Sequence, residues 1–275
     1  MTAGDDMLLI CVNYRKPAET QHFVSTALDQ KLNSSLQLVV VDNSPRPEPA
    51  LDDPRVKTIA TGENLGYFGG AAAALSDHLK SHSLPDWVIV SNPDVFFPDR
   101  DVLQRLSESH HGNEPAVIAP SIRTVDTSVE QNPYMRVRPS PLRMHVYRWI
   151  FSAYPIDVVY QGLSWIKNRA LEAGSKGRSP APASSAEKIY APQGAFIAFH
   201  RSYFDRGGTL DHGAFLFGEE IFVAETARRL GLTVLYEPAV AIEHTERSTA
   251  AGLFNRDTSR YRRQASRYLA RTFFS

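Results

Sequence analysis

The sequence predicts an α/β protein whose central sheet is mostly parallel, with helices on both faces. In the first 120 residues, short and nearly continuous apolar runs alternate with longer helical segments. This alternation is typical of parallel strands buried on both faces. Polar residues stand directly after three of the apolar runs, where ligands bind in such sheets. The length of 275 residues suits one large domain.

Each element of the first half has its own signal. The apolar run Met7–Val12 ends at Asn13-Tyr14, and the run Leu38–Val41 ends at Asp42-Asn43-Ser44. Both are short enough for buried strands. Trp87–Val90 is a third such run and precedes Ser91-Asn92-Pro93-Asp94. Weaker strands are expected at Val56–Ala60 and Ala116–Ala119, and helices at Ala18–Leu32, at the alanine-rich segment Phe68–Leu79 and at Asp99–Leu106.

The pattern breaks between Arg123 and Tyr190. Met144 to Lys167 is rich in aromatic residues, and the polar segment at about 168–189 contains Gly174, Gly177, Pro180 and Pro182, which predicts a mobile loop. Regular structure is expected to resume with a strand at Ala195–His200, a helix from Glu219 or Glu220 to just before Gly231, and strands at Thr233–Tyr236 and Ala239–His244.

A last helix is expected at Thr258–Thr272. Tyr261, Ala265, Tyr268 and Leu269 fall on one face of it, and four arginines at positions 260, 263, 267 and 271 fall on another. This pattern fits a solvated helix packed on the domain. It also fits a helix that contacts phosphates or a membrane surface.

Composition narrows the classes of function. Lys+Arg and Asp+Glu balance at 30 each, so no global positive field indicates nucleic-acid binding. Cys11 is the only cysteine, which excludes an internal disulfide and a cysteine-based zinc site and fits a reducing compartment. The polar N-terminus is unlike a signal peptide, and no run approaches the roughly 20 apolar residues of a membrane span. We therefore expect a cytoplasmic protein with at most peripheral membrane contact.

Asn92-Pro93-Asp94 is the strongest single motif. Pro93 lacks an N–H and ends the ladder of the preceding strand, which projects Asp94 at the sheet edge. A carboxylate there suits a hard divalent cation that also bridges to substrate phosphates. A turn in which Asp94 or Asp99 caps the next helix fits the spacing equally well.

Four other motifs also leave two interpretations each. Asp42 suits a nucleobase or ribose contact, or an Asx-turn before Pro45. The glycines after Asn64 suit a phosphate at a helix N-terminus, but they lack the spacing of a P-loop or dinucleotide site. Glu219-Glu220 suits a general base or a helix cap. His244 suits a metal or diphosphate contact, or a structural histidine.

Taken in order, these motifs resemble one family, the family 2 inverting glycosyltransferases, and above all its rhamnosyltransferase-like branch. The resemblance spans about residues 7–248. The ordered set is Val12-Asn13-Tyr14, Val41-Asp42-Asn43-Ser44, Glu63-Asn64-Leu65-Gly66, Ser91-Asn92-Pro93-Asp94, Gly194-Ala195-Phe196, Phe217-Gly218-Glu219-Glu220 and His244.

The resemblance implies a GT-A fold and a set of roles. A nucleotide-sugar-binding half would span 1–122, an acceptor-binding and catalytic half 123–248, and a basic helical tail 249–275. Asp94 and His244 would bind Mg²⁺ or Mn²⁺, and Glu220 would be the general base beside Glu219. The residues implied to hold the donor are Asn13, Tyr14, Asp42, Asn64 and Asn92.

The sequence departs from the family pattern at two places. Glu219-Glu220 replaces the usual Glu-Asp pair, which leaves open which glutamate is the base. Arg247 follows shortly after His244, where the family often has Gly and Ser, and we expect Arg247 to contact the donor diphosphate.

The implied reaction is an inverting single displacement. A sugar would pass from a nucleoside-diphosphate donor, such as dTDP-rhamnose, to a hydroxyl of a glycan or lipid-linked glycan. The segment Tyr147, Arg148 and Trp149 suits a shelf on which the acceptor sugar stacks, and it equally suits part of an ordinary core helix. Membrane contact through the basic tail and a homodimer are compatible with this function. A sugar-nucleotide-forming nucleotidyltransferase is an alternative, although no glycine-rich loop follows the first strand. A non-catalytic carbohydrate-binding protein is another, against which Asp94, Glu220 and His244 argue.

Overall fold

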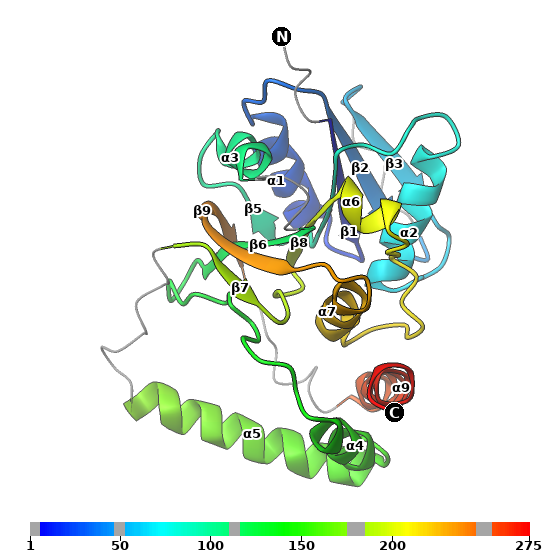
Figure 1. The fold of residues 1–275 in the computed structure, drawn as a ribbon, viewed down its shortest axis with the longest axis vertical. Coiled ribbons are helices and arrows are strands. Elements are labelled where there is room, and N and C mark those ends of the chain that lie inside the picture. Colours follow the sequence, from blue (N-terminus) through cyan, green and yellow to red (C-terminus); the bar gives the residue numbers. More distant parts are fainter. Residues whose placement is uncertain (1–5, 47–52, 110–115, 175–184, 246–254) are drawn as a thin grey trace.

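A mixed sheet with helices on both faces forms the centre of the molecule (Figure 1). The computed structural model describes residues 6–46, 53–109, 116–174, 185–245 and 255–275. Within these residues the strands follow the order β3-β2-β1-β4-β8-β6-β9-β5, and β7 pairs with β9. Their bounds are β1 Met7–Asn13, β2 Leu36–Asp42, β3 Val56–Ala60, β4 Trp87–Ser91, β5 Val95–Phe96, β6 Val117–Thr124, β7 Glu187–Ile189, β8 Phe196–His200 and β9 Val234–His244.

The helices connect these strands and add a separate layer. Their bounds are α1 Pro17–Leu28, α2 Tyr67–His78, α3 Val102–Glu108, α4 Pro141–Ile150, α5 Tyr154–Gly174, α6 Arg201–Asp205, α7 Glu219–Arg229 and α9 Arg256–Phe273. No helix in the described ranges combines the length and apolar character that crossing a bilayer requires.

Alternation along the buried strands builds two cores. Leu8 and Ile10 of β1 face the core that includes Phe68 of α2 and Phe222 of α7. Met7, Leu9 and Cys11, which alternate with them along β1, face the opposite core together with residues of α1 and α3. Because successive side chains of a strand point to opposite faces, a strand buried on both faces is apolar throughout. This confirms the predicted α/β class.

The second half of the chain completes the sheet of the first half. β1, β2, β3 and β4 are parallel, whereas β8 inserts antiparallel between β4 and β6. β9 then pairs parallel with β6. The proposed boundary at 122/123 lies inside β6, so the two halves share one sheet and one pair of cores.

Two other expectations need correction. The strands expected at 233–236 and 239–244 are a single strand, β9, whose pairing with β6 shifts register between Pro120 and Ser121. The loop expected at about 168–189 contains the end of α5 and the whole of β7, while 175–184 lie outside the described residues. Helical and strand periodicity in this polar segment is masked by its glycines and prolines.

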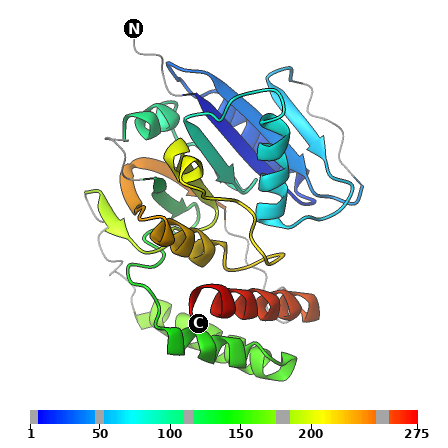
Figure 2. The ribbon, with the colours of Figure 1, turned by 45° about the vertical axis from the view of Figure 1, so that its right-hand side comes forward.

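Three helices form a layer apart from the sheet, at the end of the molecule opposite the N-terminus (Figures 1 and 2). They are α4, α5 and α9. Ser140 caps α4 by accepting a hydrogen bond from the Arg143 N–H, and Asn255 caps α9 in the same way. The apolar face of α9, with Ala265, Leu269 and Phe273, is buried. The tail is therefore helical as predicted, and its apolar face packs on the domain.

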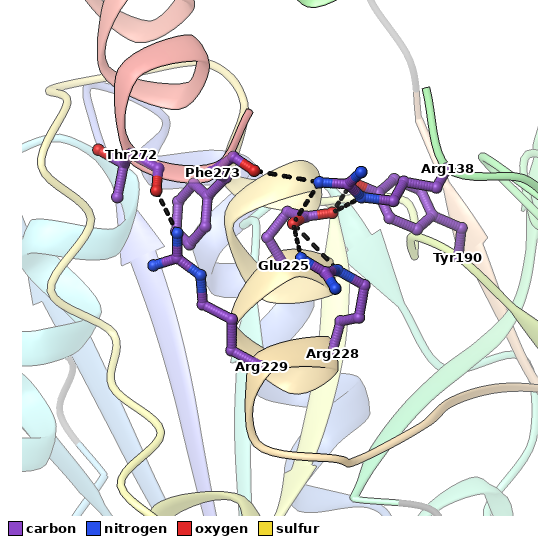
Figure 3. A network of polar contacts seen from close by, with 7 residues as sticks. All are labelled: Arg138, Tyr190, Glu225, Arg228, Arg229, Thr272 and Phe273. Carbon is purple, nitrogen blue, oxygen red and sulfur yellow. Dashed lines mark hydrogen bonds and ion pairs between the residues drawn. The ribbon is translucent and has the colours of Figure 1, made fainter. Parts of the chain in front are cut away.

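A buried carboxylate fixes this tail to α7 (Figure 3). Glu225 of α7 is fully buried and lies 2.6 Å from Arg138 and 3.0 Å from Arg228. Tyr190 donates a hydrogen bond of 2.8 Å to the same carboxylate. Arg138 also donates to the carbonyl of Phe273, at the end of α9. Burial alone would raise the pKa of Glu225, but its arginine and tyrosine partners hold the pKa below the ordinary value.

Candidate functional site

The polar residues that follow β1, β2 and β4 meet in one crevice, as the strand order predicts. A pocket of about 420 Å³ lies there. Its polar wall includes Asn43 after β2 and Asp94 after β4. The other lining residues are Val12, Tyr14, Lys16, Asn64, Gly66, Tyr67, Asn92, Pro93 and Leu216.

Asn13 and Asp42 lie beneath this pocket rather than in its wall. Both are 2% exposed. Asn13 Nδ2 donates to Asp42 Oδ1 at 3.2 Å, and the Ser44 N–H donates to the same oxygen at 2.9 Å. The second contact is the Asx-turn that the sequence left as an alternative. Asn43 is the residue of this loop that reaches the pocket, and its Nδ2 donates to the Gly66 carbonyl at 2.8 Å.

Asp94 does not cap a helix, whereas Asp99, the other residue of that alternative, accepts a hydrogen bond of 3.0 Å from the Asp101 N–H just before α3. Asp94 Oδ2 lies 2.5 Å from Lys16 Nζ, and its Oδ1 lies 3.3 Å from His244 Nε2. The short strand β5 produces the second contact, because Val95 pairs with His244. Burial alone raises the pKa of Asp94, but His244 and Lys16 outweigh burial and hold the pKa below its ordinary value. Asp94 is therefore a stable anion at neutral pH.

The surroundings of Asp94 fit a divalent cation. Asp94 Oδ1 is buried, and within the described residues it makes no hydrogen bond of ordinary geometry, although His244 Nε2 lies 3.3 Å from it. His244 Nδ1 lies 2.9 Å from Gln131 Oε1, and this contact orients the ring so that Nε2 points at Asp94. Histidines that bind metals are commonly oriented through their other nitrogen in this way. The described residues contain no cluster of three or more acidic, histidine or cysteine side chains, so the remaining ligands would come from substrate and water.

The second acidic centre is at the start of α7. Gly218, with φ of +83°, is the N-cap residue and has no side chain to cap the helix, while Glu219 and Glu220 lie in the first turn. Both carboxylates accept backbone hydrogen bonds, so the helix-terminus interpretation stands beside that of a general base. Glu219 is buried, and burial followed by the charge of Glu220 raises the pKa of Glu219 to about 8. Burial also raises the pKa of Glu220, although hydrogen bonds from its own N–H and from that of Gly194 oppose the rise.

Gly194 makes room for the Glu220 carboxylate. A Cβ at this position would lie 2.8 Å from Glu220 Oε1, so any side chain would displace that carboxylate. On another side, the charge of Glu220 is the main reason why the pKa of Tyr134 is raised. Tyr134 is 52% exposed, so Glu220 lies near an open side of the site.

Tyr67 lies between the two acidic centres. Its hydroxyl is buried and has no hydrogen-bond partner among the described residues. Burial raises the pKa of Tyr67 well above its ordinary value, and the charges of Glu219, Asp94 and Glu220 add to the effect. The Tyr67 side chain thus lines the pocket while its buried hydroxyl lies within the electrostatic field of both acidic centres.

Most of the residues that the sequence singled out lie in or beside the site. Tyr14, Asn64, Asn92 and Asp94 line the pocket, and His244 contacts Asp94. Arg247 lies outside the described residues. Sequence reasoning did not identify the contribution of Lys16, Tyr67, Gln131 or Tyr134. Lys16 and Tyr67 adjoin recognised motifs, whereas Gln131 reaches His244 from 113 positions away and carries no local signal.

Comparisons with known proteins agree with this geometry. No protein-family model matches the chain. The chain is 24% identical over 250 residues to an N-acetylglucosaminyl-diphospho-decaprenol L-rhamnosyltransferase of Mycobacterium tuberculosis, which covers 87% of this chain and 76% of the relative.

Solved structures resemble the fold at low sequence identity. The crystal structure of GalNAc-T7 with UDP, GalNAc and Mn²⁺ has a TM-score of 0.57 and 11% identity, over 92% of this chain and 47% of that one. The crystal structure of S. aureus TarS has a TM-score of 0.53 and 10% identity, and the match covers 88% of this chain and 37% of that one. This chain thus spans about half or less of each neighbour's length. The fold is GT-A, and the relative's sequence supports a glycosyltransferase of the rhamnosyltransferase-like type, as the motifs predicted.

Proposed function

We propose that this chain, a GT-A glycosyltransferase similar to family 2 rhamnosyltransferases, transfers a sugar with inversion from a nucleoside diphosphate to a hydroxyl of a lipid-linked glycan. One observation carries the proposal. Asp94, Lys16 and Tyr67 line one pocket, with His244 in contact with Asp94, and the charges of Asp94 and of the Glu219-Glu220 pair both act on Tyr67.

The donor's diphosphate would lie against the Asp94 cluster. Asp94 and His244 would hold Mg²⁺ or Mn²⁺, which when bound neutralises charge on the leaving diphosphate. Lys16 lines the same pocket and brings an ammonium within 2.5 Å of Asp94, so it stabilises negative charge on the same side. The base and ribose would contact the wall formed by Tyr14, Asn43 and Asn64, while Asn13 and Asp42 support that wall from beneath.

Glu220 is the better candidate for the general base. Burial raises the pKa of both glutamates, and the charge of Glu220 raises the pKa of Glu219 further, to about 8. Glu220, whose carboxylate accepts a hydrogen bond from Gly194, is therefore the member of the pair that we assign as the base. In the proposed step the acceptor oxygen attacks the anomeric carbon and gives its proton to Glu220. The bond from that carbon to the diphosphate oxygen breaks on the opposite face, and the nucleoside diphosphate leaves.

The acceptor would approach over Tyr134. This side chain is half exposed and lies within the field of Glu220, Tyr147 and Tyr160. Of the three residues expected to form an acceptor shelf, Tyr147 packs against Phe151 and Tyr160, whereas Trp149 is 65% exposed. A lipid-linked acceptor is supported by the decaprenol-linked substrate in the name of the mycobacterial relative. dTDP-rhamnose is the proposed donor because the motifs resemble the rhamnosyltransferase-like branch and the relative is named an L-rhamnosyltransferase. A cytoplasmic, membrane-peripheral location and a homodimer are further parts of the proposal.

A transfer assay tests this function. Purified protein would be incubated with Mn²⁺, a polyprenyl-diphosphate-linked N-acetylglucosamine and either dTDP-rhamnose or UDP-sugars. We expect Glu220→Gln to lower kcat by about 10²–10⁴-fold, the usual contribution of general base catalysis, with nucleoside-diphosphate binding retained. Glu108→Gln, an exposed carboxylate on α3, is the matched control. Full transfer activity in Glu220→Gln would exclude this residue as the base. Pyrophosphate release from a nucleoside triphosphate and a sugar phosphate would instead indicate the nucleotidyltransferase alternative.

A further inference from the structure

Helices α4 and α5 carry large apolar side chains that no described part of the chain covers. Leu142 and Trp149 of α4 are 75% and 65% exposed, and Val159, Leu163 and Ile166 of α5 are between 59% and 63% exposed. Contiguous apolar exposure of this kind is unusual on a soluble monomer and marks an interaction surface.

The spacing places these residues on one outer face of each helix. In α4 Leu142, Val146 and Trp149 follow each other at intervals of four and three residues, as do Val159, Leu163 and Ile166 in α5. We call these two rows the outer apolar faces. The inner sides of the same helices are occupied: Met144 is buried, and Asp157 forms a buried ion pair of 2.8 Å with Arg262 of α9.

Most of the charge on α4 and α5 is positive. Their acidic residues are Asp157, which is buried and paired with Arg262, and Glu172 near the end of α5. Arg143, Arg148 and Lys167 lie on the same two helices. A face of leucine, valine, isoleucine and tryptophan bordered by cations matches the interfacial region of an anionic bilayer. A second copy of this chain would bring the same cations against one another.

The position of the two helices suits such a contact. Figure 1 shows α5 as the outermost element at the end of the molecule away from the sheet, with α4 beside it. Figures 1 and 2 draw the tail helix α9 on the sheet side of α4 and α5, and Ala265, Leu269 and Phe273 of α9 are buried. The apolar surface that can enter a bilayer is therefore that of α4 and α5.

We infer that the outer apolar faces of α4 and α5 bind to the surface of an anionic lipid bilayer. This inference goes beyond the proposed transfer reaction and does not depend on the donor or on the base. If it holds, the lipid part of a lipid-linked acceptor stays in the bilayer while its sugar enters the crevice beside Tyr134.

Vesicle flotation tests the inference with the full-length protein. Vesicles would contain phosphatidylcholine alone or phosphatidylcholine mixed with phosphatidylglycerol. We expect the native protein to float with the anionic vesicles and not with the neutral ones. Leu163→Asp on α5 and Leu142→Asp on α4 should each lower the bound fraction by about tenfold or more, because each places a charge in the apolar contact.

Matched controls separate this surface from general effects. Leu79→Asp changes an apolar residue that is 44% exposed at the end of α2, and Lys31→Glu removes an exposed cation far along the sequence from α4 and α5. Both should float like the native protein, whereas Arg148→Glu should float less. Circular dichroism would verify that each variant is folded.

Three outcomes would overturn the inference. The first is native protein that does not bind anionic vesicles. The second is Leu163→Asp and Leu142→Asp variants that bind as well as Leu79→Asp. The third is a native dimer, measured by light scattering, that Leu163→Asp converts to a monomer, because this would assign the outer apolar faces to self-association.

Discussion

Asp94 illustrates how a single residue gains its meaning from distant parts of the chain. Read locally, it follows a strand and precedes a helix, and its spacing fits a cap as well as a metal ligand. In the fold, Lys16 reaches it from the start of α1 and His244 from the end of β9. The sequence predicted His244 as its partner through resemblance to a family, but Lys16 was not expected there because the interaction depends on side-chain conformation.

Glu219 makes a pH-dependent prediction. Its pKa rises from an ordinary 4.5 to about 8 in the folded protein, so the folded state keeps a proton that the unfolded chain releases. The stability linked to this proton is complete below about pH 4.5 and is lost as pH rises toward 8. Glu219→Gln has no such proton. We therefore expect the variant to exceed the native protein in free energy of unfolding by more at pH 8 than at pH 5.5.

Urea denaturation at both pH values measures this difference. Glu108→Gln, at an exposed position on α3, provides the control and should track the native protein at each pH. A Glu219→Gln difference that is the same at pH 5.5 and pH 8 would show that Glu219 is ionised in the native state, and it would reopen the choice of base between the two glutamates.

Among the elements, those that carry buried strands were predictable and those that depend on packing were not. β1, β2 and β4 are apolar throughout because both of their faces are buried, so composition alone identified them. β5 has only two residues and is defined by its pairing with β9, for which no local pattern exists. α5 was not predicted as an element, and α4 was anticipated only as the core-helix alternative around Tyr147, Arg148 and Trp149, since exposed apolar residues obscure the usual contrast between an inner and an outer face.

The network around Glu225 predicts that α7 and α9 depend on each other. Glu225→Gln removes the charge that neutralises Arg138 and Arg228. We expect a loss of about 2–3 kcal/mol in the free energy of unfolding, less than the loss of a fully buried ion pair because both guanidinium groups are partly exposed.

The Glu225 effect should also depend on pH with a definite sign. Because the pKa of Glu225 is lowered by its partners, its contribution is present at neutral pH and is lost as pH falls through its folded pKa. Urea denaturation of native protein, Glu225→Gln and the exposed control Glu63→Gln would show this. Equal stability of native protein and Glu225→Gln at neutral pH would contradict a role for the network in fixing the tail.

At the scale of the whole molecule, the site exists because the second half of the chain completes the sheet of the first. β8 enters beside β4 and brings Gly194 close to Glu220, while β9 brings His244 to Asp94. The order of motifs was sufficient to predict the GT-A fold, and it named most of the residues that the fold gathers at the candidate site. It could not predict Gln131, Tyr67 or Tyr134, because their roles arise from long-range packing and from the field of the two acidic centres.

The most direct measurement is nucleotide binding with and without metal. Calorimetry would compare dTDP and UDP binding to native protein and to Asp94→Asn, in the presence and absence of Mn²⁺. We expect Mn²⁺ to tighten diphosphate binding to the native protein by about tenfold or more, which corresponds to about 1.4 kcal/mol, and to have no such effect on Asp94→Asn. Metal-dependent binding that is equally strong in Asp94→Asn, or native protein that binds neither nucleotide, would contradict the assignment of this crevice as a metal-assisted nucleotide-sugar site.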